Sequence, residues 1–204
     1  MNRNIIIAAR LLSAVFRPQY YSVVAFIVLF MCTWLSLLPL PFKIFVLVII
    51  TLGTVALPRM FTRLWRQANG WHLYQLRERE KRFAPYLFNI VCYGLTLYLL
   101  DRLHLPQYMR GVLVGALGIQ IACAFINLWW KISTHCAGTG GAIGALVAYS
   151  IVFGFNPTGW LCLLILISGL VGSSRMLLRQ HTLMQVVAGT IVGCICGFLG
   201  IILK

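Results

Sequence analysis

Seven long apolar runs dominate this chain of 204 residues and limit how it can fold. A helix needs roughly 20 residues, with a range of about 17–25, to cross the hydrocarbon core of a bilayer. Lipid offers no hydrogen-bond partners to exposed backbone, so each crossing is expected to be a helix. The sequence therefore predicts an all-α polytopic transmembrane helix bundle with six to seven spans. The runs cover about residues 20–40, 43–58, 86–101, 110–130, 139–155, 159–173 and 182–203.

The first part of the chain carries the main uncertainty in the number of spans. The tight turn at 38–41 contains two prolines, so the first two runs could form a hairpin that does not fully cross. Before them, residues 1–19 alternate three arginines with apolar residues, a pattern typical of an amphipathic segment at the membrane interface. We expect this interfacial segment to be followed by a single transmembrane domain over residues 20–204.

Composition excludes several classes of protein. Hydrophobic residues make up 61% of the chain and charged residues only 10%, against roughly 25% in soluble domains. The net charge of +14 comes with long apolar runs rather than with a basic soluble face, so we expect no nucleic-acid binding. Such a charge suits anionic membrane lipids or a phosphorylated substrate.

Metal sites are not expected either. The seven cysteines form no pair of C-x-x-C motifs, which argues against a structural zinc site. The chain has three acidic residues, Glu78, Glu80 and Asp101, too few for the carboxylate cluster that holds Mg²⁺ and a diphosphate. We therefore predict chemistry without a metal or other cofactor.

A first polar cluster joins two apolar runs at residues 131–141. Its Ser, Thr and Gly residues could open a helix whose backbone N–H groups favour an anion. Lys131 and His135 are four residues apart and would share a face if that stretch is helical. The alternative is a glycine-rich turn between helices with an interfacial histidine.

A second cluster lies at residues 173–185. His181 and Gln185 are four residues apart, so Gln185 can accept the ring N–H of His181 and fix its tautomer. Arg175 and Arg179 supply planar cations suited to phosphate oxygens. The alternative is a basic loop before a packed helix. Two spans separate each polar cluster from the next, so both share a membrane face with the basic segment at 59–85. One pocket could then collect residues from all three: Arg82, His135, Arg175 and His181.

The order of these clusters resembles the type 2 phosphatidic acid phosphatase superfamily. Its third motif, S-R-x5-H-x3-D, is matched by Ser174, Arg175 and His181, with Gln185 in place of Asp. Its second motif, P-S-G-H, is matched at Ser133 and His135 only. In the first motif, K-x6-R-P, Arg82 stands with a displaced proline, and Arg77 or Arg79 replaces the lysine.

The resemblance implies a lipid phosphate phosphatase that hydrolyses a phosphate or diphosphate monoester. His181 would be the nucleophile that forms a phosphohistidine, His135 would protonate the leaving group, and Gln185 would orient His181. Fixed cations and donors would stabilise the charge that spreads over the phosphoryl oxygens. The residues expected to hold the phosphate are Arg82, Arg175, Ser133, Lys131 and Arg79.

The expected partners are membrane lipids and one phosphorylated lipid. Undecaprenyl diphosphate, phosphatidic acid, phosphatidylglycerol phosphate and a lipid A phosphate all remain open as substrates. A non-catalytic lipid-binding or scaffold member of the same fold is the main alternative, because Gln185 replaces an aspartate. An intramembrane protease or a transporter fits less well, since no Gly-x-Ser-x-Gly motif and no broken or repeated pair of spans is visible.

Two arguments about orientation conflict. The resemblance implies a bacterial inner-membrane protein whose site faces the periplasm. With seven spans, however, the N-terminal arginines share the face of the motifs, and the excess of Lys and Arg there predicts a cytoplasmic site. If residues 20–58 make only one span, those arginines move to the opposite face. From the sequence we adopt the periplasmic site.

Overall fold

The chain forms a bundle of helices. The computed structural model describes residues 3–70, 83–103 and 105–203, and these residues include no strand. The all-α prediction is therefore confirmed. The helices are α1 (Arg3–Val15), α2 (Pro18–Cys32), η1 (Trp34–Leu37), α3 (Leu40–Thr51), η2 (Leu52–Ala56), α4 (Leu57–Ala68), α5 (Phe83–Arg102), α6 (Gln107–Ile126), α7 (Thr134–Phe153), α8 (Thr158–Leu177) and α9 (Leu183–Ile202).

Six helices are long and apolar enough to cross a membrane: 40–68, α5, α6, α7, α8 and α9. The bent pair of α1 and α2 would raise the number to seven. Large apolar side chains such as Leu166, Ile191 and Leu95 are exposed along these helices, as expected for a surface in contact with lipid. The prediction of a membrane protein with six to seven spans is confirmed.

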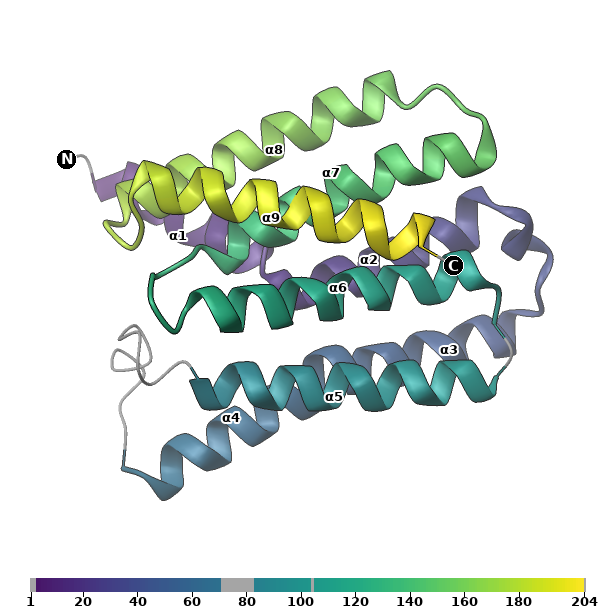
Figure 1. Cartoon of the computed structure of the whole chain (residues 1–204), viewed down its shortest axis with the longest axis horizontal. Helices are drawn as coiled ribbons and strands as arrows, with labels where there is room; N and C mark the ends of the chain where they lie inside the picture. The colour runs from purple at the N-terminus through teal and green to yellow at the C-terminus, as the bar shows by residue number, and fades with distance from the viewer. Residues whose placement is uncertain (1–2, 71–82, 104, 204) are drawn as a thin grey trace.

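The bend between α1 and α2 has a local cause. The axes of the two helices meet at 57°. Arg17 is extended (φ −75°, ψ 141°) because it precedes Pro18, which disfavours the helical conformation in the residue before it. Pro18 then opens α2, where its missing N–H costs nothing. The amphipathic α1 thus leaves the bundle axis and packs on α8 (Figure 1).

A single helix of 29 residues runs from Leu40 to Ala68. Its middle, η2, is a π-helical turn that comes just before Pro58. Proline cannot donate to the carbonyl four residues earlier and its ring crowds that carbonyl, so a wider turn relieves the conflict. The polar segment expected at 59–85 therefore begins as the amphipathic α4, which continues the span.

The tightest packing in the bundle is between α7 and α9. Glycines line both sides, and a Cβ at Gly144, Gly193 or Gly197 would overlap a backbone carbonyl of the facing helix. Such small residues allow two membrane helices to approach closely. The glycines at 138–141 were expected either in a turn or as anion-binding backbone at a helix start. A helix does start in this segment, at Thr134, but the glycines come after its first turn and are buried inside α7, so they form neither an interhelical turn nor the exposed helix start.

Candidate functional site

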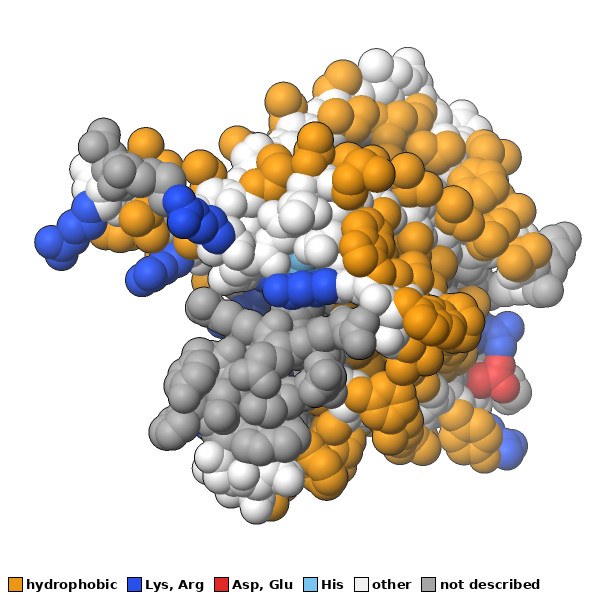
Figure 2. Space-filling model, turned by 60° about the vertical axis from the view of Figure 1, so that its left-hand side comes forward, with side chains coloured by type: hydrophobic (Ala, Val, Ile, Leu, Met, Phe, Trp, Pro, Cys, Tyr) orange, Lys and Arg blue, Asp and Glu red, His pale blue; other side chains and the backbone are white. Residues whose placement is uncertain are grey.

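A polar cleft of about 290 Å³ opens at one end of the bundle. This end holds the start of α2, α5, α7 and α9 and the end of α6 and α8, at the left of Figure 1. Figure 2 brings this end forward and shows Lys and Arg side chains around a histidine. We call this hollow the polar cleft; it is lined by Arg17, Pro18, Gln19, Pro85, Tyr86, Asn89, Gln120, Thr134, His135, Arg175 and His181.

His181 lies immediately before α9 and is only 8% exposed. Its Nδ1 is 3.1 Å from Gln185 Oε1, the contact predicted from the sequence, although His181 precedes α9 and so does not share a helical face with Gln185. The same Oε1 accepts the backbone N–H of Thr182 at 3.3 Å, as part of a capping box at the start of α9. Helix capping therefore holds Gln185 in the position from which it contacts His181.

These two contacts determine the tautomer of His181. A backbone N–H can only donate, so the Gln185 atom that it contacts must be the carbonyl oxygen. That oxygen can only accept, so His181 Nδ1 must carry a hydrogen. In the neutral ring, Nε2 is then the nitrogen with the lone pair.

His135 sits in the first turn of α7 and also lines the cleft. Its Nε2 is 3.2 Å from the backbone oxygen of Ser13, in the last turn of α1. Helix ends leave their last carbonyl groups without intrahelical partners, and His135 satisfies one of them. Because a carbonyl only accepts, Nε2 of His135 is the donor in this contact.

Arg175 completes the group of predicted residues in the cleft. It lies in the last turn of α8 and is 9% exposed. The hydroxyl of neighbouring Ser174 turns back to the Leu170 carbonyl (2.7 Å) instead of entering the cleft. The cleft therefore brings together His135 of α7, Arg175 of α8 and His181, which precedes α9.

Two residues predicted to bind phosphate do not line the cleft. Ser133 is fully buried as the N-cap of α7, where its Oγ accepts from the Cys136 N–H at 3.4 Å and donates to Cys136 Sγ at 3.1 Å. Its hydroxyl is used by the helix start, as is common for a serine in this position. Lys131 precedes α7, which begins only at Thr134, so it does not share a helical face with His135.

The remaining predictions on the first motif, Arg82 and Arg79, fall outside the described residues. Sequence reasoning missed other residues of the cleft: Arg17, Gln19, Asn89 and Gln120. For the last two a signal was available, because each is an isolated amide within an apolar run, where a polar side chain is costly.

The chemistry available to the cleft is that of imidazole and guanidinium groups. Among the described residues, no three His, Cys, Asp or Glu side chains are grouped closely enough to hold a metal ion. Two histidines supply groups for nucleophilic and acid–base steps, and Arg175 supplies a fixed cation with several donors. These are the kinds of group that phosphoryl transfer through a histidine nucleophile requires.

Comparison with known proteins adds no relative. No family model, curated protein or solved structure matches this chain. Membership of the type 2 phosphatidic acid phosphatase superfamily therefore stays a prediction from the motifs.

Proposed function

We propose that this membrane protein hydrolyses a lipid phosphate or diphosphate monoester through a phosphohistidine intermediate. The observation that carries the proposal is the convergence of His181, His135 and Arg175 in one polar cleft. Their positions in the chain are 46 residues apart at the extremes, and three helices bring them together. The expected substrates are the membrane lipid phosphates named above, presented at this end of the bundle.

In the proposed reaction, His181 Nε2 attacks the phosphorus atom while Gln185 holds the opposite side of the ring. A phosphorus–nitrogen bond forms and the bond from phosphorus to the leaving oxygen breaks. The bound phosphate anion favours the protonated ring of His135, which keeps its Nε2–H on the Ser13 carbonyl and donates its Nδ1 proton to that oxygen. Arg175 stabilises the charge spread over the phosphoryl oxygens. Water then attacks phosphorus and gives its proton to His135, the phosphorus–nitrogen bond breaks, and inorganic phosphate leaves with His181 returned to its neutral ring.

The direct test is phosphate release by the purified full chain in detergent, with a lipid phosphate as substrate. We expect turnover in the presence of EDTA and inhibition by vanadate, which resembles a phosphoryl group in the transition state. His181→Ala should leave less than about a thousandth of the activity, as for the loss of a nucleophile. Complete loss of wild-type activity on chelation, restored by Mg²⁺, would contradict the mechanism.

A non-catalytic lipid-binding or scaffold protein is the second candidate. One observation favours it: Gln185 is neutral and cannot stabilise a positively charged His181 as a carboxylate would. In that case the wild-type chain would bind lipid phosphates and release no phosphate. Arg175→Ala would still weaken that binding, whereas His181→Ala would change nothing measurable in turnover.

A further inference from the structure

The lining of the cleft also includes residues outside the three motifs, which are joined by a series of polar contacts. Arg59, on α4, donates from Nε to Gln19 Oε1 over 2.9 Å, and its guanidinium lies 4.8 Å above the Tyr20 ring. Gln19 Nε2 in turn donates to Asn89 Oδ1 over 3.3 Å. The contacts link α4, α2 and α5. This series of contacts reaches the cleft, where Gln19 and Asn89 are lining residues.

Arg59 determines the direction of both hydrogen bonds in this series, Arg59 to Gln19 and Gln19 to Asn89. Arginine has no acceptor, so the Gln19 atom that it contacts must be the carbonyl oxygen. The other end of the Gln19 amide is then the NH₂ group, which requires the oxygen of Asn89 as its acceptor. The NH₂ group of Asn89 is left over, without a hydrogen-bond partner among the described residues. This series of contacts thus presents the NH₂ group of Asn89 to the cleft as a donor.

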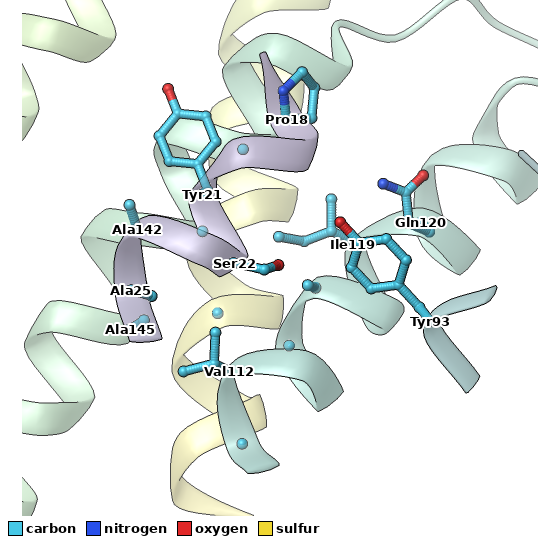
Figure 3. Close-up of a pocket in the computed structure, with 16 residues that line it drawn as sticks. Pro18, Tyr21, Ser22, Ala25, Tyr93, Val112, Ile119, Gln120, Ala142 and Ala145 are labelled. Atoms are coloured by element: carbon cyan, nitrogen blue, oxygen red, sulfur yellow. The ribbon is translucent and has the colours of Figure 1, made fainter. Parts of the chain in front are cut away.

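Gln120 adds a second amide from α6. It is only 6% exposed and makes no hydrogen bond to any described residue. It also borders an inner cavity of about 80 Å³, which lies deeper in the bundle beside Tyr93, Ser22 and Ile119. Figure 3 shows the Gln120 amide turned toward the end of that cavity marked by Pro18, which borders the polar cleft as well. The atoms of this amide are not closed off from solvent, so water can reach them, and a ligand that displaces this water must supply equivalent hydrogen bonds.

The geometry points to a neutral polar subsite, formed by Asn89 and Gln120, that binds an uncharged oxygen acceptor next to the phosphate of the ligand. This inference rests on the proposed function only in placing the phosphate beside Arg175 and His181. Amides satisfy a hydroxyl or ester carbonyl without the repulsion or strong attraction that a charged side chain would add. A ligand whose hydrocarbon begins directly after the phosphate leaves both amides unsatisfied, which lowers its affinity.

The test compares two ligands with one saturated C16 chain each, palmitoyl lysophosphatidic acid and hexadecyl phosphate. They differ in the glycerol hydroxyl and ester carbonyl that follow the phosphate. We expect the full chain in detergent to bind the first about tenfold more tightly, from about two neutral hydrogen bonds. Asn89→Ala combined with Gln120→Leu should abolish that preference and leave hexadecyl phosphate affinity within about twofold. Gln107→Leu is the matched control, because Gln107 is exposed and lies on α6 like Gln120. It should change neither the affinity for hexadecyl phosphate nor the preference between the two ligands.

A second variant tests the polarity argument without removing either amide. In Gln19→Glu, a carboxylate accepts from Arg59 and also from the Asn89 NH₂, so Asn89 must turn its oxygen to the cleft. The ratio of the two affinities should fall, whatever the added charge does to both. Equal wild-type affinities, an equal loss for both ligands in the double variant, or an unchanged ratio in Gln19→Glu would each overturn the inference. An intact preference without phosphate release from either ligand would overturn the proposed function alone.

Discussion

Gln185 serves two structural purposes with a single oxygen atom. It caps the start of α9 through Thr182 and orients His181. Gln185→Glu keeps the length of the side chain and both acceptor contacts, and it adds a charge that favours the protonated ring. We expect turnover in this variant to equal or exceed that of the wild type, measured as kcat for phosphate release.

The matched loss-of-contact variant is Gln185→Leu, which removes the acceptor at similar volume. We expect kcat to fall about a hundredfold, the loss that a displacement of about 1 Å in a reacting group can cause. The free energy of unfolding should drop by only about 1 kcal/mol, the usual cost of losing a cap. If Gln185→Leu retains full turnover, the contact with His181 has no role in the reaction.

At this scale the sequence predicts a contact between residues close in the chain and misses contacts between distant ones. The His181–Gln185 contact is predicted from the spacing of four, although it forms because Gln185 reaches back from the capping box to His181 ahead of α9. The contact of His135 with Ser13 is not, since the acceptor is a backbone oxygen 122 positions away. Ser133 shows the opposite failure: a motif serine looked like a phosphate ligand, whereas the start of α7 uses its hydroxyl.

Among the elements, α1 has the closest link to the candidate chemistry. It packs on α8 through a face that includes Ala9, 3% exposed, and Ser13, whose backbone oxygen holds His135. Ala9→Leu would insert three carbon atoms into this contact and push α1 away from α8. We expect kcat to fall about tenfold as His135 loses its acceptor.

The control for this prediction is one residue away. Ala8 is exposed on α1, so Ala8→Leu makes the same chemical change without entering the contact with α8. It should leave kcat unchanged. Equal losses of kcat in the two variants would mean that α1 acts through its general apolar character rather than through its packing on α8.

The α7–α9 contact should control the stability of the bundle. A Cβ at Gly193 would overlap the Ala137 carbonyl oxygen, which is backbone and cannot rotate away. We expect Gly193→Ala to destabilise the fold by about 1–3 kcal/mol, as overpacking usually does. A lower midpoint of thermal unfolding in detergent would confirm it.

Gly169 on α8 provides the comparison, because a Cβ there meets nothing within 4 Å. Gly169→Ala should be neutral or stabilising, since alanine forms helix better than glycine by about 1 kcal/mol. A destabilisation equal to that of Gly193→Ala would indicate a general sensitivity of glycines, unrelated to the facing helix.

For the whole molecule, hydropathy predicts the class of fold and roughly where each span lies. It does not predict that α3, η2 and α4 form one helix, because the arginines of α4 look like the start of a loop. Nor does it predict which glycines pack: Gly138 and Gly140 look like part of a turn, whereas Gly138 packs on Tyr21 of α2 and Gly140 on the Thr190 backbone of α9. Both errors have the same cause, since a residue's role here depends on the neighbouring helix.

The arrangement of the first helices bears on which membrane face holds the cleft. In Figure 1, α2 runs from the cleft end to the opposite end and α3–α4 runs back, so α1 lies at the cleft end. This matches the seven-span arrangement considered from the sequence. At the cleft end lie Arg3, Arg10, Arg17, Arg59, Arg63, Arg66, Lys131, Arg175 and Arg179; at the opposite end lie Lys43, Arg102 and Arg110.

This distribution predicts a cytoplasmic cleft, against the periplasmic site that the resemblance implies. Without Arg17 and Arg175, which line the cleft where a ligand would bind, seven basic residues at the cleft end still face three at the opposite end, so the positive-inside rule gives the same result. Single cysteines at Ala68 and Asn156, exposed at opposite ends, can be introduced into a cysteine-free chain that still folds. In intact spheroplasts, we expect a membrane-impermeant maleimide to label Asn156→Cys at once and Ala68→Cys only after lysis. The reverse pattern would place the cleft in the periplasm and show that its arginines are retained for the substrate rather than for topology.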